Sequence, residues 1–269
     1  MALTALPTAI RLWGHTLIKT FLSMDILNNL FNRRPKLIID SREALEEAAI
    51  KFGLLPFFPN NIRGLSVEEM CAPGMLFGGN YDEGCWEWKG PVVRRKTTAY
   101  GKFFRRKAGF VSLDLLPDFL NYRRKTYPVK PESTEELLLD IIRENEGLSS
   151  TDLKAYIFGG YDTKREWNDL PSIGNEEFKS PKRKSLESPL QRLQMGGWII
   201  ISDFVYKRTK KGERYGWGVA TYSTPELNFG SHLKLPSGKS AEESLDFIIS
   251  NMKKRFPGAS RKDLITLLK

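Results

Sequence analysis

Histidine and cysteine are both scarce in this sequence. Its 269 residues include two histidines, His15 and His232, and two cysteines, Cys71 and Cys85. So small a supply argues against a Ser-His-Asp triad, a histidine-rich metal site and a zinc deaminase signature. Two cysteines cannot form a disulfide framework, and their spacing fits no zinc pattern. We therefore expect neither a metal nor a cofactor.

Two phosphate-binding patterns and a long apolar run are also missing. The sequence holds neither GxGxxG nor GxxxxGK[ST], which argues against dinucleotide and P-loop chemistry. No apolar run reaches the roughly 18 residues that cross a bilayer. We therefore expect no membrane span and a cytoplasmic location.

The N-terminal residues 1–39 are expected to form a tail outside the packed domains. The first 23 residues carry no ionisable side chains besides Arg11, His15 and Lys19, which lie four apart and share one helical face. This pattern predicts an amphipathic tail or an organellar targeting segment. An over-extended gene start, with the true start at Met24, is the alternative, and we favour it.

Positive charge is what the sequence has in excess. Lys and Arg number 42 against 32 Asp and Glu, which gives a formal net charge of +10 and a pI near 9.5. A charge of this size predicts an anionic partner, either nucleic acid or a membrane surface. Hydrophobic residues make up 41% of the chain and aromatic residues 12%, so it can form a packed core.

The length predicts two packed units, at roughly 150 residues per domain, and the pattern of elements predicts an α+β fold. A linker with spaced prolines, TYPVKPES, marks the boundary. We expect an N-terminal α+β domain over residues 40–128, a winged helix-turn-helix domain over 129–228 and a helical segment over 229–269. The two helices expected after Ser240 either pack on the core or complete a second, tandem winged helix.

The N-terminal domain is predicted to hold a helix over Asp40–Phe52 and a small antiparallel sheet. Cys85–Ser112 is rich in aromatic and β-branched residues, which predicts two or three strands. Lys89–Lys125 contains eleven Lys and Arg, interleaved with aromatic residues, against two acidic residues, a mixture that suits a nucleic-acid groove. The alternative is that these aromatic residues are core. The candidate nucleic-acid-binding residues are Arg94, Arg95, Lys96, Arg105, Arg106 and Lys107, and the candidate base-stacking residues are Trp86 and Trp88.

From Ser133 the sequence predicts helix, helix, loop, helix and a two-stranded hairpin, the order of a winged helix-turn-helix. The third helix, within residues 186–197, is expected to turn Ser188, Gln191, Arg192 and Met195 outward. A basic turn, KRTKKGE, joins the strands and suits contact with phosphates, although a merely solvated tip is the alternative. The candidate DNA-binding residues here are Gln191, Arg192, Lys207, Arg208, Lys210, Lys211 and Arg214.

Two segments resemble a known family. WEWKGPV…YGKFFRRKAGFVS with LLPDFLNYRR, and LQRLQMGGWIIISDFVYKR…YGWGVATYSTPE, are similar to bacterial proteins related to AlkZ. The resemblance implies tandem winged helices around a DNA channel and an N-glycosylase that removes alkylated purines. It also implies a Gln-x-Gln motif that aligns the attacking water, for which this sequence offers Gln194 but has Gly196 at the second position.

We therefore expect a winged-helix protein that binds double-stranded DNA, acts in DNA repair and has N-glycosylase activity on alkylated purines. Gln194 is the candidate for orienting water, and Glu87 and Asp203 are candidate carboxylates for stabilising an oxocarbenium-like sugar. Two alternatives stay open. One is a non-catalytic winged-helix regulator or lesion sensor, and the other is a basic module that meets an acidic protein or a membrane surface.

Overall fold

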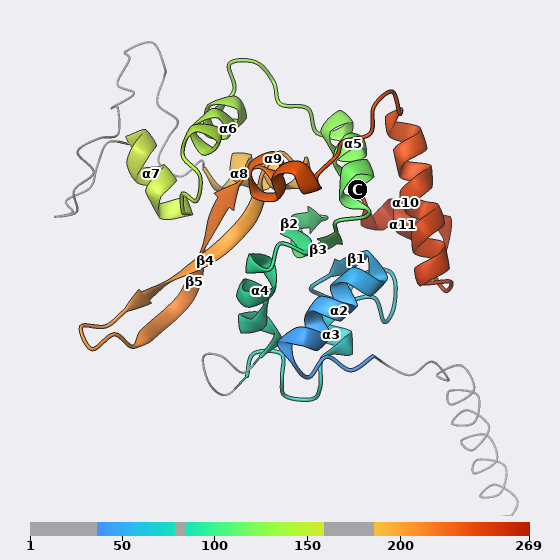
Figure 1. Ribbon diagram of the computed structural model, residues 1–269, viewed down its shortest axis with the longest axis horizontal. Helices are drawn as coiled ribbons and strands as arrows, with labels where there is room; N and C mark the ends of the chain where they lie inside the picture. The colour runs from blue at the N-terminus through green and yellow to red at the C-terminus, as the bar shows by residue number, and fades with distance from the viewer. Residues whose placement is uncertain (1–36, 79–83, 159–185) are drawn as a thin grey trace, which may run out of the picture. The chain divides into compact units, whose positions relative to one another are not determined.

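The computed structural model describes residues 37–78, 84–158 and 186–269. Residues 38–269 form one compact unit, which contains elements from both sides of the expected boundary at residue 128. Within the described ranges the chain folds into helices and small antiparallel sheets, the α+β architecture that the sequence predicts (Figure 1). The finer division into domains stays a prediction, and residues 1–36 of the expected tail lie outside the described residues.

The N-terminal part is a three-stranded antiparallel sheet, in the order β1-β3-β2, with helix α2 packed against β3. Its elements are α2 (Arg42–Phe52), β1 (Leu54–Pro56), α3 (Val67–Met70), β2 (Thr98–Phe104) and β3 (Lys107–Ser112). The side chain of Ser41 caps α2, and Ser66 caps α3 by accepting a hydrogen bond from the Glu69 N–H. Gly53, with φ at +78°, ends α2 in a conformation that favours glycine. The helix predicted over Asp40–Phe52 is therefore confirmed, and so is an antiparallel sheet with two strands within Cys85–Ser112, whereas its third strand, β1, was not predicted.

One segment expected as a strand is a helix. Residues Cys85–Arg94 form α4, which packs against α2 and the later strand β4. Aromatic and β-branched residues favour strands only through their packing, so burial of a helical face outweighs their composition. The buried side chains of α4 recur at helical spacing and are Cys85, Trp88, Lys89, Val92 and Val93.

The C-terminal helices pack on the sheet domain. They are α10 (Ala241–Arg255) and α11 (Arg261–Leu267), and α10 lies along α5 (Leu116–Thr126) and also touches α2. The Asn121 amide of α5 donates to the Lys239 carbonyl at 2.9 Å and to Ser244 Oγ at 2.9 Å. Of the two arrangements left open for the helices after Ser240, the described residues thus show packing on the core.

The remaining elements follow the order expected from Ser133 onward. They are α6 (Thr134–Glu144), α7 (Ser150–Phe158), α8 (Glu187–Met195), β4 (Ile200–Arg208) and β5 (Arg214–Ser223), followed by α9 (Pro225–Phe229) and the 3-10 turn η1 (Gly230–His232). Ser133 caps α6 as predicted, and Ser149 and Asp152 exchange hydrogen bonds at the start of α7. The expected loop at 159–185 lies outside the described residues. Met195, expected to face outward, is instead 6% exposed, because α8 packs against both α6 and β2.

Arg123 joins distant parts of this unit. Its side chain is fully buried, and its guanidinium donates to the carbonyls of Met195 (2.5 Å), Phe103 (3.2 Å) and Leu268. Burial lowers the pKa of Arg123. One side chain therefore fixes the end of α8 against β2 and the C-terminal segment.

Among the helices of the described ranges, none is long and apolar enough to cross a membrane.

Candidate nucleic-acid interface

The outward face of α8 and the turn between β2 and β3 lie next to each other. Helix α8 packs against β2, and Gln191 Nε2 donates to the Arg106 carbonyl at 3.5 Å. Arg105 and Arg106 have φ values of 48° and 67°, where a two-residue hairpin turn usually holds asparagine or glycine. Holding two arginines there costs on the order of 1 kcal/mol each. The sequence did not predict that these two segments meet.

We call this region the α8 surface. Its residues are Gln191, Arg192, Arg105, Arg106 and Lys107. The three basic residues of the turn are exposed, and Arg192 forms a partly exposed ion pair with Glu135 of α6 at 3.0 Å. Exposed cations beside a polar helix face can contact phosphates while the helix meets base edges.

Gln194 has a structural position. It is 2% exposed, its Oε1 accepts from the Lys102 N–H at 3.1 Å, and its Nε2 donates to the Leu190 carbonyl at 3.2 Å. Both ends of the amide are thus engaged in a buried network between α8 and β2. This arrangement stabilises the contact between the two elements and gives Gln194 no exposed group with which to orient a water.

The second basic surface is the tip of the β4–β5 hairpin, residues 207–214. Lys207, Arg208, Lys210 and Lys211 are exposed along it, and Arg208 also donates to the Gly212 carbonyl at 2.8 Å. Arg214 is half-buried and lies over the ring of Tyr206, 3.5 Å from its centroid. The turn is the one the sequence predicted, and the β4–β5 hairpin that carries it extends away from the other elements (Figure 1).

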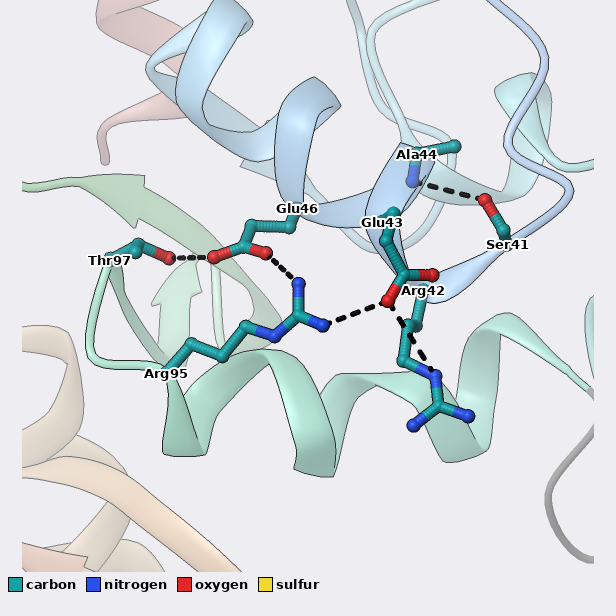
Figure 2. Close-up of polar contacts among 7 residues, drawn as sticks. All are labelled: Ser41, Arg42, Glu43, Ala44, Glu46, Arg95 and Thr97. Atoms are coloured by element: carbon teal, nitrogen blue, oxygen red, sulfur yellow. Dashed lines mark hydrogen bonds and ion pairs between the residues drawn. The ribbon is translucent and has the colours of Figure 1, made fainter.

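Arg94 and Arg95 bind acidic side chains of the protein itself. Arg94 pairs with Asp203 of β4 at 2.7 Å. Arg95 reaches α2, where it pairs with Glu46 and with Glu43 at 2.8 Å, and Glu46 also accepts from Thr97 (Figure 2). These hydrogen bonds, with Glu46 first and Glu43 second, raise the pKa of Arg95. The two arginines connect α4 to its neighbours in addition to contributing charge.

The remaining members of the long basic stretch do not share one surface. Lys96 is exposed with φ at 55°. Lys89 is 3% exposed and Arg123 is fully buried, so neither adds to a groove for nucleic acid. The charge of this stretch therefore separates into a buried share, an ion-paired share and an exposed share, and the exposed share includes the turn of the α8 surface.

Glu87 and Asp203, the candidate carboxylates, occupy different elements. Glu87 lies on α4, half-buried, and accepts a hydrogen bond from Tyr206 Oη at 2.6 Å. Burial, and then this hydrogen bond, raises the pKa of Tyr206, so its phenol keeps the proton that it donates. Asp203 accepts from both Arg94 and the Phe204 N–H, the latter at 2.7 Å. Glu87 is thus the carboxylate held by a neutral donor, and Asp203 the one held by a cation.

Lys89 is buried beside the Trp86 ring, a position that the sequence did not indicate. Its ammonium group lies 3.9 Å from the Trp86 ring centroid and 4.6 Å from that of Phe204, and it donates to the Trp86 carbonyl. Burial lowers the pKa of Lys89 to about 8, against the attraction of Glu87, which raises it. The helical spacing of Cys85, Lys89 and Val92 was the available signal.

The two tryptophans proposed for base stacking differ in exposure. Trp88 is 7% exposed and belongs to the core, whereas Trp86 is half-buried at the surface of α4. The described ranges contain no group of three or more His, Cys, Asp or Glu side chains placed to hold a metal ion. The groups that this part of the protein presents to a ligand are therefore cations, aromatic rings and the hydrogen-bonded pair of Glu87 and Tyr206.

Comparison with known proteins gives a family. The chain is similar to the solved structure of Streptomyces sahachiroi DNA glycosylase AlkZ, with a TM-score of 0.43 and 13% sequence identity. That similarity covers 86% of this chain and 59% of the other, so the chain spans less than two thirds of its relative's length. No curated protein matches the chain. A family model described as AlkZ related matches residues 39–269, and the chain therefore belongs to the AlkZ-related family.

Proposed function

We propose that this protein binds double-stranded DNA as a winged-helix protein of DNA repair. In this proposal α8 is the recognition helix and the β4–β5 hairpin is the wing. The observation that carries it is the hairpin tip, where Lys207 and Arg208 at the end of β4 and Lys210 and Lys211 in the turn are all exposed. Exposed cations on a projecting hairpin suit a phosphate backbone.

The α8 surface supports the same partner from a second pair of elements. Two arginines held at strained turn positions place charge beside Gln191, whose amide suits an adenine edge. The repair context comes from the family: AlkZ, whose name the family description carries, is described as a DNA glycosylase. An acidic protein partner would not require a polar helix face of this kind.

Binding is tested by fluorescence anisotropy of a labelled DNA duplex over a series of salt concentrations. The variant Lys210→Ala/Lys211→Ala should lower affinity about equally for all sequences, and the slope of log K against log salt should fall by about 0.9 for each lost phosphate contact. Lys253→Ala/Lys254→Ala removes the same charge from the exposed last turn of α10 and serves as the control. An unchanged slope in the hairpin variant would refute phosphate contact by the wing.

The finer part of the proposal is N-glycosylase activity on alkylated purines, with Glu87 as the carboxylate that stabilises the reacting sugar. It is tested by incubating the protein with duplex DNA that carries N7-alkylated guanine and measuring base release. Glu87→Gln should abolish release and keep duplex binding, because the amide oxygen still accepts from Tyr206. Asp203→Asn is the comparison for the second carboxylate. Binding without release in the unaltered protein would favour a non-catalytic regulator or lesion sensor.

A further inference from the structure

Three aromatic rings from different parts of the chain, Trp86 of α4, Trp217 of β5 and Phe77, meet at the surface. Trp217 of β5 is 67% exposed, and Phe77, which follows α3, is 54% exposed. The Trp86 and Trp217 centroids are 5.9 Å apart with the rings nearly perpendicular, and Phe77 lies 5.9 Å from Trp86 and 6.5 Å from Trp217. We call these three residues the aromatic cluster. Exposed aromatic rings that cluster, unlike single exposed apolar residues, indicate an interaction surface.

The position of Trp217 is set by a bulge in β5. Strand register passes from Val205 opposite Val219 to Lys207 opposite Tyr215, so three residues of β5 lie opposite one residue of β4. Glycines flank Trp217 within the bulge. Gly216 has φ at +73°, and a Cβ on Gly218 would lie 2.8 Å from Tyr206 Cζ, so both positions depend on glycine. A bulge of this kind redirects a side chain, here toward Trp86.

Trp86 is the fixed member of the aromatic cluster. Phe57 and Phe58 contact its ring at centroid distances of 5.4 and 6.1 Å, and the buried Lys89 ammonium lies 3.9 Å from its centroid. The outer rings, Phe77 and Trp217, therefore stand on a rigid base and leave most of their own surface in water. Preformed aromatic surface of this kind binds a flat ring with little loss of conformational freedom.

The charge around the aromatic cluster indicates what the flat ring belongs to. Trp217 lies on the same hairpin as the four exposed cations of the tip, and Arg214 lies three residues away along β5. A ligand that fits both features carries a planar aromatic group and, on the far side of a short linking group such as a sugar, anionic groups. A nucleotide within a DNA strand has this chemistry, since its base stacks and its phosphates pair with lysine and arginine.

We infer that the aromatic cluster is a stacking site for an unpaired nucleobase of DNA that is held by the hairpin cations. This inference rests on the proposed function, because it names the part of the DNA that the same hairpin binds. Fully paired duplex offers its bases only at the strand ends, whereas a base outside the stack exposes both faces. The protein should therefore bind a duplex with one extrahelical base more tightly than the same duplex fully paired.

The experiment compares two labelled duplexes, one fully paired and one with a single extrahelical base, by fluorescence anisotropy with the full chain. Trp217→Ala should weaken binding of the extrahelical duplex by about fivefold to a hundredfold, the usual effect of removing one stacked ring, and leave the paired duplex unchanged. Tyr215→Ala is the matched control, since Tyr215 is 46% exposed on the same strand. It should keep the preference. Far-UV circular dichroism of each variant shows whether the fold is intact.

The possible outcomes of this experiment distinguish the stacking site from the proposed function. Salt-dependent binding of both duplexes with equal affinity would overturn the stacking site and leave the proposed function standing. Binding of neither duplex would overturn both. A preference that survives in Trp217→Ala would show that the extrahelical base is bound elsewhere. A dimer in size-exclusion chromatography that Trp217→Ala dissolves would overturn the inference in favour of contact between two copies of the chain.

Discussion

Lys89 gives the protein a stability that rises with pH above neutrality. Its pKa is about 8 in the folded protein, against about 10.5 for an exposed lysine. Below about pH 8 the side chain is protonated in both the folded and unfolded states, so the cost of burying the charge is fully present. As pH rises from about 8 to about 10.5, the folded protein releases this proton while the unfolded chain still holds it. The free energy of unfolding therefore increases over that window.

The size of the effect follows from the shift. A depression of about 2.5 pKa units corresponds to about 3 kcal/mol, of which roughly 2 to 3 kcal/mol is regained by about pH 10. Lys89→Met removes the titrating group and keeps an apolar chain of similar length beside Trp86 and Phe204. The stability of the variant minus that of the unaltered protein should thus fall by roughly 2 to 3 kcal/mol between about pH 7 and about pH 10.

Urea unfolding followed by far-UV circular dichroism measures this difference at each pH. Other titrating groups are common to both proteins and cancel in the difference. Lys102→Met, which removes an exposed lysine from β2, is the control for the loss of a lysine side chain. A constant difference for Lys89→Met over the same range would refute the reasoning, because it would mean that the ammonium group stays in water.

Two further predictions concern stability. Arg123→Met should lower the free energy of unfolding by about 3 kcal/mol or more, because it leaves buried carbonyl oxygens without their donor. Arg143→Met, at an exposed position, is the control in the same urea series. A loss below about 1 kcal/mol in Arg123→Met would contradict the role of Arg123. Cys71 and Cys85 have their sulfur atoms 2.6 Å apart, and burial raises both thiol pKa values, so a thiol oxidant such as diamide should close a disulfide slowly. Closing a loop of this length should raise stability by about 3 kcal/mol, and Cys71→Ser, which cannot form the bond, should show no gain.

The features that the sequence predicted correctly are local ones, which depend on residues close together along the chain. The caps at Ser133 and Ser149 form hydrogen bonds close along the chain, and the helices they begin were predicted from those residues alone. The charged tip of the β4–β5 hairpin is equally local. The α+β class followed from such signals, since each element could be identified by itself.

Contacts between distant segments could not be predicted in this way. Composition favoured strands for Cys85–Arg94, whereas packing against α2 and β4 makes it a helix. The sequence predicted Lys89 and Arg95 as free surface charges. In the structure Lys89 is buried, and Arg95 pairs with acidic side chains of α2. The contact between Trp217 and Trp86 depends on a bulge in β5 and on the pairing of distant segments, so the sequence did not predict it. Long-range pairing decides these outcomes.

The buried guanidinium of Arg123 has a consequence for how the protein is made. Its acceptors at Phe103, Met195 and Leu268 lie 20, 72 and 145 residues away along the chain. A ribosome that adds about 5–20 residues per second delivers the last of them roughly 7–30 seconds after Arg123 itself. During that interval the growing chain carries a cation whose final partner has not been synthesised. Completion of the core is thereby delayed until Leu268 has been synthesised.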